Sequence, residues 1–422
     1  MHILLFIALF AAFSTTNVPK HLITAIYGEG SGVVPTPDPS IAPIATQARY
    51  VNWVYTGISG GTDWIAAYNN AGVNTTTYIS VWRNYSDNGV AYTDIAPGGA
   101  HAAAEATDCT GNPLTTGTVY LNDPRTGAVS LGHVNYVTHL LSSEYTALFE
   151  DNAAVIGGVE GLPCGYLYNG NFIPATNSIN SQVTNSAGKT ALLFVNTING
   201  WWIDNDGPAG WVDATSLSAP ANVLGLECEQ CYLRHTQGIS NGKLIGATWM
   251  SMENAEIAMV QKQKIFWSYA NSTCAAGDTA LALDQRMYEY ASALLSYDPA
   301  YLMFQECFAS TPSNFLIMPE TQLVPEMPTV TATSSVLSYL VNGNLYARQF
   351  AACYYAGALV GPCAVLINPS ATTYAIPSNI YIAYTNSVIL QGTGLLDGGT
   401  LLFTGTKPAS VGPYSGAVLI GH

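Results

Sequence analysis

Two apolar segments of the chain end in carboxylates. One, at 147–151, reads ALFED, and the other, at 223–229, reads VLGLECE. Successive side chains of a strand point to opposite faces, so Asp151 and Glu150 lie on different faces, whereas Glu227 and Glu229 share one. Two carboxylates across a site can divide acid–base work. An ionised one attacks or stabilises a cationic centre, and a protonated one gives its proton to a leaving oxygen. Cleavage of a glycosidic bond requires such a pair.

The environments of these acids suggest their roles. We predict that Asp151, which is followed by Asn152, stays ionised and serves as the nucleophile. Burial would raise the pKa of a glutamate, which suits Glu229 as the acid/base residue, with Glu227 as the alternative in that role. On the second segment we expect Leu224, Leu226 and Cys228 to face outer helices.

The elements that must position these acids alternate along the chain. Apolar runs predict eight strands, and helical patterns lie between several of them, such as 134–143 and 281–295. This alternation predicts an α/β fold, a (β/α)8 TIM barrel over residues 47–328, whose active site lies at the carboxyl ends of its strands. The predicted strands are Tyr50–Tyr55, Thr76–Trp82, Thr118–Leu121, Ala147–Glu150, Ala191–Asn196, Val223–Glu229, Lys264–Tyr269 and Tyr301–Gln305.

Polar and aromatic residues at these strand ends are candidates for binding sugar hydroxyls and sugar faces. The predicted substrate-binding residues are Tyr55, Trp82, Arg83, Asp123, Asn196, Trp201 and Glu306.

The two ends of the chain differ from the barrel in character. The apolar run at the N-terminus predicts a signal peptide at 1–17, and a Gly- and Pro-rich stretch predicts a leader at 18–46. Residues 329–422 predict a small antiparallel C-terminal β-domain with strands such as 364–368, 380–384 and 400–404. No later segment is apolar enough to span a membrane in the mature chain.

The eight cysteines and three sequons, at Asn74, Asn84 and Asn271, are typical of a secreted, extracellular, disulfide-bonded glycoprotein. Cys353 and Cys363 flank an expected hairpin and are the best candidates for a local pair. Cys228-x-x-Cys231 has the spacing of half a zinc site or of a redox motif, but no second pair completes a metal site.

Charge and motifs exclude several classes of function. The net charge is −15, with only 12 Lys and Arg, which disfavours nucleic acid as a partner. The glycines at 28–32 lack the strand that precedes a nucleotide-binding loop, so no cofactor is expected. The seven histidines do not cluster, so no metal is expected either.

Several segments, in order, resemble those of the glycoside-hydrolase-like barrel families related to endo-α-1,4-polygalactosaminidases. They are DCTGNP at 108–113 with YLNDP at 120–124, LFEDN at 148–152, LFVN at 193–196, GLECE at 225–229, and YARQF at 346–350 with VLINP at 365–369. The resemblance implies a carbohydrate substrate, an acid on the fourth strand and another on the sixth, here Asp151 and Glu229. The usual Asp-Gly before the strand-four motif is Tyr145-Thr146 in this chain.

A second hypothesis is a non-catalytic protein on the same fold. A secreted barrel with 9% charged residues is also typical of a carbohydrate-binding or structural protein that self-assembles into a surface layer or filament. The separation of the two carboxyl groups distinguishes these interpretations, because glycosidases hold them about 5–9.5 Å apart.

Overall fold

The computed structural model gives the course of the chain in separate stretches, and only these are described. They are residues 22–27, 44–48, 51–55, 62–80, 97–99, 102–116, 119–126, 145–151, 163–184, 189–199, 214–229, 231–233, 239–240, 242–269, 280–309, 320–326, 333–355, 357–380, 386–391, 400–404 and 408–420.

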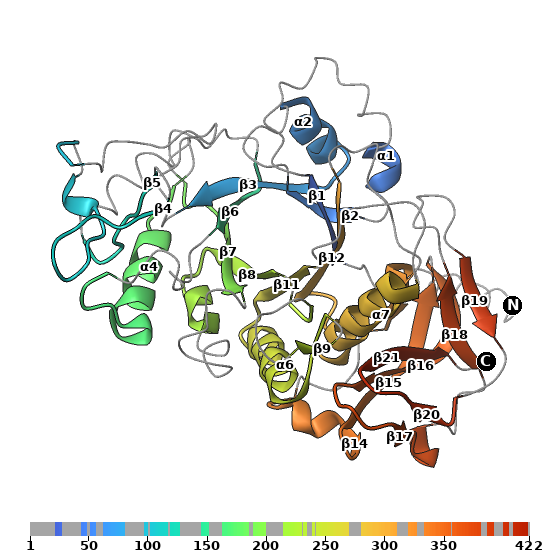
Figure 1. Ribbon diagram of the computed structural model, residues 1–422. Coiled ribbons are helices and arrows are strands. Elements are labelled where there is room, and N and C mark those ends of the chain that lie inside the picture. Colours follow the sequence, from blue (N-terminus) through green and yellow to red (C-terminus); the bar gives the residue numbers. More distant parts are fainter. Residues whose placement is uncertain are drawn as a thin grey trace, which may run out of the picture.

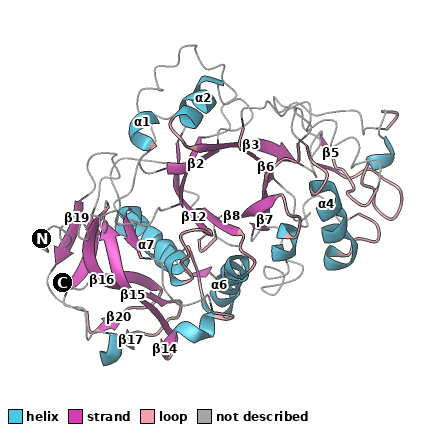
Figure 2. Cartoon of the chain, turned by 180° about the vertical axis from the view of Figure 1, so that it is seen from behind, coloured by secondary structure: helices cyan, strands magenta, loops and turns pink. Residues whose placement is uncertain are grey.

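Eight parallel strands close into a barrel, which Figure 2 shows as a ring. Around the ring they follow the order β1-β12-β11-β8-β7-β6-β3-β2, and β2 pairs with β1 to complete it. The fold is therefore a (β/α)8 barrel, as predicted. The strands are β1 (Leu22–Tyr27), β2 (Val51–Tyr55), β3 (Asn74–Ser80), β6 (Ala147–Asp151), β7 (Leu193–Asn199), β8 (Val223–Glu229), β11 (Ile265–Tyr269) and β12 (Leu302–Ala309).

Two expectations about the barrel were wrong. The described part of the predicted strand at 118–121, residues 119–121, contributes no barrel strand. Within them, β5 (Val119–Tyr120) pairs with β4 (Thr115–Thr116) as a short antiparallel hairpin. The missing strand is β1, inside the predicted 18–46 leader, so the barrel begins near residue 22 rather than 47. The reason is that β1 is a mostly apolar run of only six residues. The long Gly- and Pro-rich stretch that follows it predicts a leader and not a strand. The two errors cancel in the count, and β6 and β8 remain the fourth and sixth strands.

Helices lie outside the ring. They are α1 (Ile44–Gln47), α2 (Thr62–Asn70), α4 (Ile173–Asn180), α6 (Gly246–Gln261) and α7 (Ala280–Leu295), with shorter turns such as η4 (Thr215–Ser218). The helix predicted at 281–295 is confirmed by α7, whereas the one predicted at 134–143 lies outside the described residues, as does the 1–17 signal peptide. Among the residues described, no helix is long and apolar enough to cross a bilayer.

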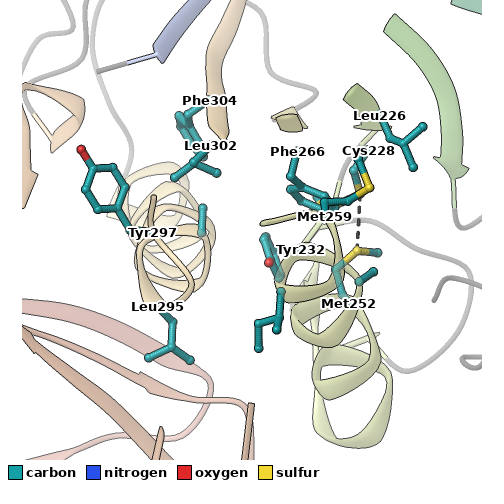
Figure 3. Close-up of a cluster of buried hydrophobic side chains, with 14 of the residues drawn as sticks. Leu226, Cys228, Tyr232, Met252, Met259, Phe266, Leu295, Tyr297, Leu302 and Phe304 are labelled. Carbon is teal, nitrogen blue, oxygen red and sulfur yellow. Dashed lines mark hydrogen bonds between the residues drawn. A yellow bond between two sulfur atoms is a disulfide. The ribbon is translucent and has the colours of Figure 1, made fainter. Parts of the chain in front are cut away.

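Apolar side chains pack on both faces of the strands, as a barrel covered by helices requires. Figure 3 shows part of the outer core, where Leu226, Cys228 and Phe266 meet Met252 and Met259 of α6. The Cys228 and Met252 sulfur atoms lie 3.5 Å apart.

The interior of the barrel is filled mainly by aromatic rings. Trp53 of β2 reaches across to Phe194 of β7, with ring centroids 4.8 Å apart. Trp267 of β11 packs against both Phe194, at 5.5 Å, and Phe149 of β6, at 5.3 Å. The barrel is thus a packed core below its carboxyl end, not a pore.

A β-bulge interrupts the alternation of β8. Leu193 pairs with Val223, but the next residue of β7, Phe194, pairs with Gly225, so Leu224 is an extra residue. Leu224 packs against the interior aromatic cluster, contrary to the prediction that it faces the helices. Leu226 and Cys228 do belong to the outer core.

A separate antiparallel sheet lies beyond α7 (Figure 1), which confirms the predicted C-terminal β architecture. Its first strand, β13, precedes residue 329, so the sheet begins earlier than predicted. Its main strands run in the order β13 (Leu323–Pro325), β15 (Leu345–Tyr355), β16 (Ala358–Asn368), β21 (Ser415–Ile420), β18 (Asn386–Gln391) and β19 (Thr400–Thr404). Shorter strands are β14 (Leu340–Asn342), the pair β17 (Tyr374–Ala375) and β20 (Ser410–Val411), and, next to the barrel, the pair β9 (Ile239–Ser240) and β10 (Lys243–Leu244).

Disulfide Cys353–Cys363 joins β15 to β16, as predicted. Gly416 lets β21 lie close against α7, because a Cβ there would come within 2.8 Å of the Met287 carbonyl oxygen. The Tyr290 hydroxyl of α7 donates to the Leu323 carbonyl at 2.6 Å, a second link between the barrel helices and the sheet.

Candidate functional site

The carboxyl ends of β6 and β8 lie two strands apart in the ring, with only β7 between them. On β6, Ala147 and Phe149 belong to the interior cluster and Leu148 to the outer core. Strand alternation therefore assigns position 151 to the interior face, where its backbone pairs with Ser80 of β3. Of Asp151 itself only this backbone position is described.

Glu227 is the described acid of the interior face of β8. It pairs in register with Asn196 of β7 on one side and with Trp267 of β11 on the other. Only 3% of Glu227 and 8% of Asn196 is exposed. The interior polar residues therefore begin directly above the aromatic core, and Asn196, predicted to bind substrate, is next to a candidate carboxylate.

Glu229 follows Glu227 by two residues, at the end of β8. Its backbone pairs with Asn199 and Tyr269, the last residues of the neighbouring strands. Register thus places positions 151 and 229 where their strands leave the barrel, the position that such folds use for catalysis. The side chain of Glu229 is outside the described residues.

Tyr55 is the last residue of β2 and forms part of the apolar floor beneath these positions. Its ring lies 5.0 Å from that of Phe149, and it is largely buried. The structure therefore places Tyr55 inside the barrel, next to the strand that carries Asp151.

The other predicted binding residues divide into two groups. Asp123 does not end a barrel strand, because 118–121 is not one. It lies in the connection from β3 to β6, where its carboxylate accepts from the Arg125 backbone N–H at 2.9 Å and side-chain Nε at 2.8 Å. This structural pairing explains its burial. Trp82, Arg83 and Trp201 lie outside the described residues, and Glu306 is described only as a backbone position of β12.

The ionisable residues of the barrel strands are acidic. The eight strands carry five acids, Glu150, Asp151, Glu227, Glu229 and Glu306, and no Lys or Arg. Among the described residues no group of three or more His, Cys, Asp or Glu side chains is placed to hold a metal ion.

The end of β8 is held by a covalent bond and a buried hydrogen bond. Cys228 and Cys231 form a disulfide, so this motif is neither half of a zinc site nor a free dithiol here. Next to it, the fully buried Tyr232 hydroxyl donates to Glu256 of α6 at 2.6 Å. Burial raises the pKa of Glu256 to about 8, although the Tyr232 hydrogen bond opposes the shift. These contacts fix the strand end that carries Glu227 and Glu229.

Two further interior residues were missed by sequence reasoning, Trp267 and Gln305. Trp267 lies within the apolar stretch of β11, which carries no sequence signal of a binding role. At the end of β12 the acid Glu306 was preferred to its neighbour Gln305, although alternation from Met303 of the interior cluster would have selected Gln305.

Fold and site together define a (β/α)8 barrel with carboxylates at the carboxyl ends of its fourth and sixth strands. No protein-family model matches the chain, and no curated protein sequence matches it. Similar solved structures include the glycoside hydrolase domain of PelA from Pseudomonas aeruginosa, with 13% identity, a TM-score of 0.42, and coverage of 68% of this chain and 94% of that one. Another is a debranching enzyme from Nostoc punctiforme, with 12% identity, a TM-score of 0.45 and coverage of 96% and 98%. A third is Ega3 from Aspergillus fumigatus in complex with galactosamine, with 9% identity, a TM-score of 0.40 and coverage of 69% and 92%.

Proposed function

We propose that this chain is a secreted glycoside hydrolase that cleaves a poly- or oligosaccharide with two carboxylates. Asp151 acts as the nucleophile and Glu229 as the acid/base residue. The observation that carries the proposal is the strand order β6-β7-β8, which separates the two acids by a single strand. Neighbouring strands lie about 4.8 Å apart, so the two backbones are about 10 Å apart. Side chains directed to the barrel axis from such positions converge to the 5–9.5 Å that glycosidases use.

The neighbouring residues support this division of roles. Glu229 protonates the leaving oxygen while Asp151 attacks the anomeric carbon, and Glu229 then deprotonates the water that releases the sugar. Glu227 lies deeper on β8, next to Asn196 and Trp267, and adds a second acid to the site. Tyr55, Asn196, Trp82, Arg83 and Trp201 are proposed to contact the sugar. Asp123 is left out because Arg125 pairs with it, and Glu306 is left out because alternation assigns the inner face of β12 to Gln305.

Secretion is proposed because of the disulfides. Cys109–Cys164, Cys228–Cys231 and Cys353–Cys363 are all bonded, and such bonds persist in oxidising compartments. The apolar run at the N-terminus, within residues 1–17, is the proposed signal peptide for export.

The test is hydrolysis of defined oligosaccharides, measured by the release of reducing ends. We expect Asp151→Asn and Glu229→Gln each to lower kcat at least about 1000-fold while thermal unfolding stays unchanged. The matched control is Glu326→Gln, because Glu326 is an exposed acid that directly follows β13 of the C-terminal sheet. Azide should restore turnover to Asp151→Gly, with formation of a glycosyl azide.

Two results would refute the proposal. One is wild-type turnover that survives both substitutions. The other is a wild-type protein that hydrolyses no glycan but binds one or self-associates, which would favour the structural or carbohydrate-binding alternative.

A further inference from the structure

Gln305 occupies the interior face of the barrel near the end of β12. Its strand neighbours Leu302 and Phe304 belong to the outer core, and Met303 belongs to the interior cluster. Alternation therefore directs Gln305 inward, one step beyond Met303 toward the carboxyl end. Its backbone pairs with Tyr269 of β11, the residue that in turn pairs with Glu229.

The side-chain amide of Gln305 is buried, and no described residue forms a hydrogen bond with it. The residue is 0% exposed, and within the described structure neither its Nε2 nor its Oε1 has a hydrogen-bond partner. The same holds for Trp267 Nε1 and Thr76 Oγ1, which also belong to interior positions of the barrel. Burying polar groups without partners is unfavourable, so native proteins seldom retain them unless something else satisfies them.

The chemistry of these groups restricts what could satisfy them. A carboxamide offers two donors and one acceptor, which complements a pair of neighbouring hydroxyls that each donate and accept. By alternation the interior face carries acids at positions 151, 227 and 229, and the eight strands carry no Lys or Arg, so the interior is unfavourable for an anionic sugar, such as a uronic acid. The matching ligand is a pyranose that carries no negative charge and has free vicinal hydroxyls.

We propose that Gln305 is a substrate-binding residue that binds a pair of vicinal hydroxyls on a pyranose without negative charge and so determines which sugar the barrel accepts. This inference rests on the proposed glycosidase function. The indole N–H of Trp267 supplies a further donor to the same ring. In the free protein the Gln305 amide lowers stability, and sugar binding satisfies it.

Gln305→Met tests the inference, because methionine has a similar shape but no amide. Loss of an unpartnered amide should raise the melting temperature of the free protein by about 2–4 °C. Loss of two hydrogen bonds should raise KM, or weaken binding measured by tryptophan fluorescence, about 10- to 100-fold. The probes are gluco-, galacto-, manno- and chito-oligosaccharides, with oligogalacturonate as the anionic comparison.

Asn180→Leu is the matched control. Asn180, at the end of α4, is also 0% exposed, and its side-chain amide lacks partners among the described residues, but it lies outside the barrel. Its replacement should change stability and leave KM unchanged.

Each outcome decides the matter. If the wild type hydrolyses a neutral oligosaccharide and Gln305→Met keeps its KM and kcat, the inference fails while the proposed function stands. A lower melting temperature for Gln305→Met shows that the amide is already satisfied, for example by internal water, and also overturns it. Preference for oligogalacturonate contradicts the charge argument. A wild type that neither binds nor hydrolyses any probe refutes the proposed function, and the inference with it.

Discussion

Raising the pH should destabilise this protein through its buried carboxyl groups, and Glu289 of α7 is the sharpest case. Glu289 is fully buried, and neither of its carboxyl oxygens has a hydrogen-bond partner among the described residues. Burial raises its pKa to about 8, from an ordinary value of 4.5. On α6, burial also raises the pKa of Glu253, and it raises that of Glu256 to about 8.

The sign and size of the effect follow from proton linkage. Between pH 4.5 and about 8 the native protein keeps a proton on Glu289 that the unfolded chain has released, so stability falls as the pH rises. Each pH unit in this window removes about 1.4 kcal/mol from the free energy of unfolding, and the whole window about 5 kcal/mol. Domains are stable by only about 5–15 kcal/mol, so the loss is large. The full stabilisation is present below pH 4.5 and is lost as the pH passes 8.

Urea unfolding at pH 5, 7 and 9 measures this dependence. Glu289→Gln mimics the protonated acid, so it should match the wild type at pH 5 and exceed it by about 5 kcal/mol at pH 9. Glu326→Gln, which changes an exposed acid, should follow the wild type throughout. The reasoning is refuted if Glu289→Gln loses stability in parallel with the wild type as the pH rises.

Three further predictions test the framework around the site. Gly225→Ala should prevent barrel closure, because its Cβ would lie 2.2 Å from the Ile265 carbonyl oxygen; a soluble variant with wild-type circular dichroism and melting temperature would contradict this. Replacing Cys109 and Cys164 by Ala opens a bond that spans 55 residues and should lower the free energy of unfolding by about 4 kcal/mol in urea, and an unchanged midpoint would argue against the loop-entropy explanation. Arg348→Met removes two hydrogen bonds of 3.0 Å to carbonyls at the end of α7 and should lower stability by about 2–4 kcal/mol, with Arg348→Lys recovering part of the loss.

Most of the barrel was predictable because its strands are short apolar runs bounded by polar residues. The bounds of β8 and β19 match the predicted ones, and β11 differs by one residue. The first strand was not found, because its pattern is short and one of its two partners, β12, lies about 280 residues away. A local reading of sequence cannot detect such a partner.

The site was predictable only as far as each strand could be judged alone. The acids of β6 and β8 stand out because an apolar strand that ends in carboxylates has no packing explanation. Gln305 does not stand out, since its importance depends on burial and on the lack of partners among the described residues. Asp123 follows an apolar run that predicts a barrel strand, but that run pairs with β4 and is not part of the barrel. The roles of Gln305 and Asp123 therefore depend on which segments pair in the closed barrel, and the sequence of a single segment does not specify this.

The bulge at Leu224 explains how β8 presents its acids. Val223 packs in the outer core, and in a regular strand Glu227 and Glu229, at even spacings from it, would face outward as well. The extra residue places Leu224 and Gly225 in succession on the inner side and reverses the alternation beyond them. Gly225, which tolerates the close approach of Ile265, is the residue that the sequence offers as a marker for this irregularity. A single inserted residue therefore moves positions 227 and 229 from the helix-covered face of the strand to its interior face.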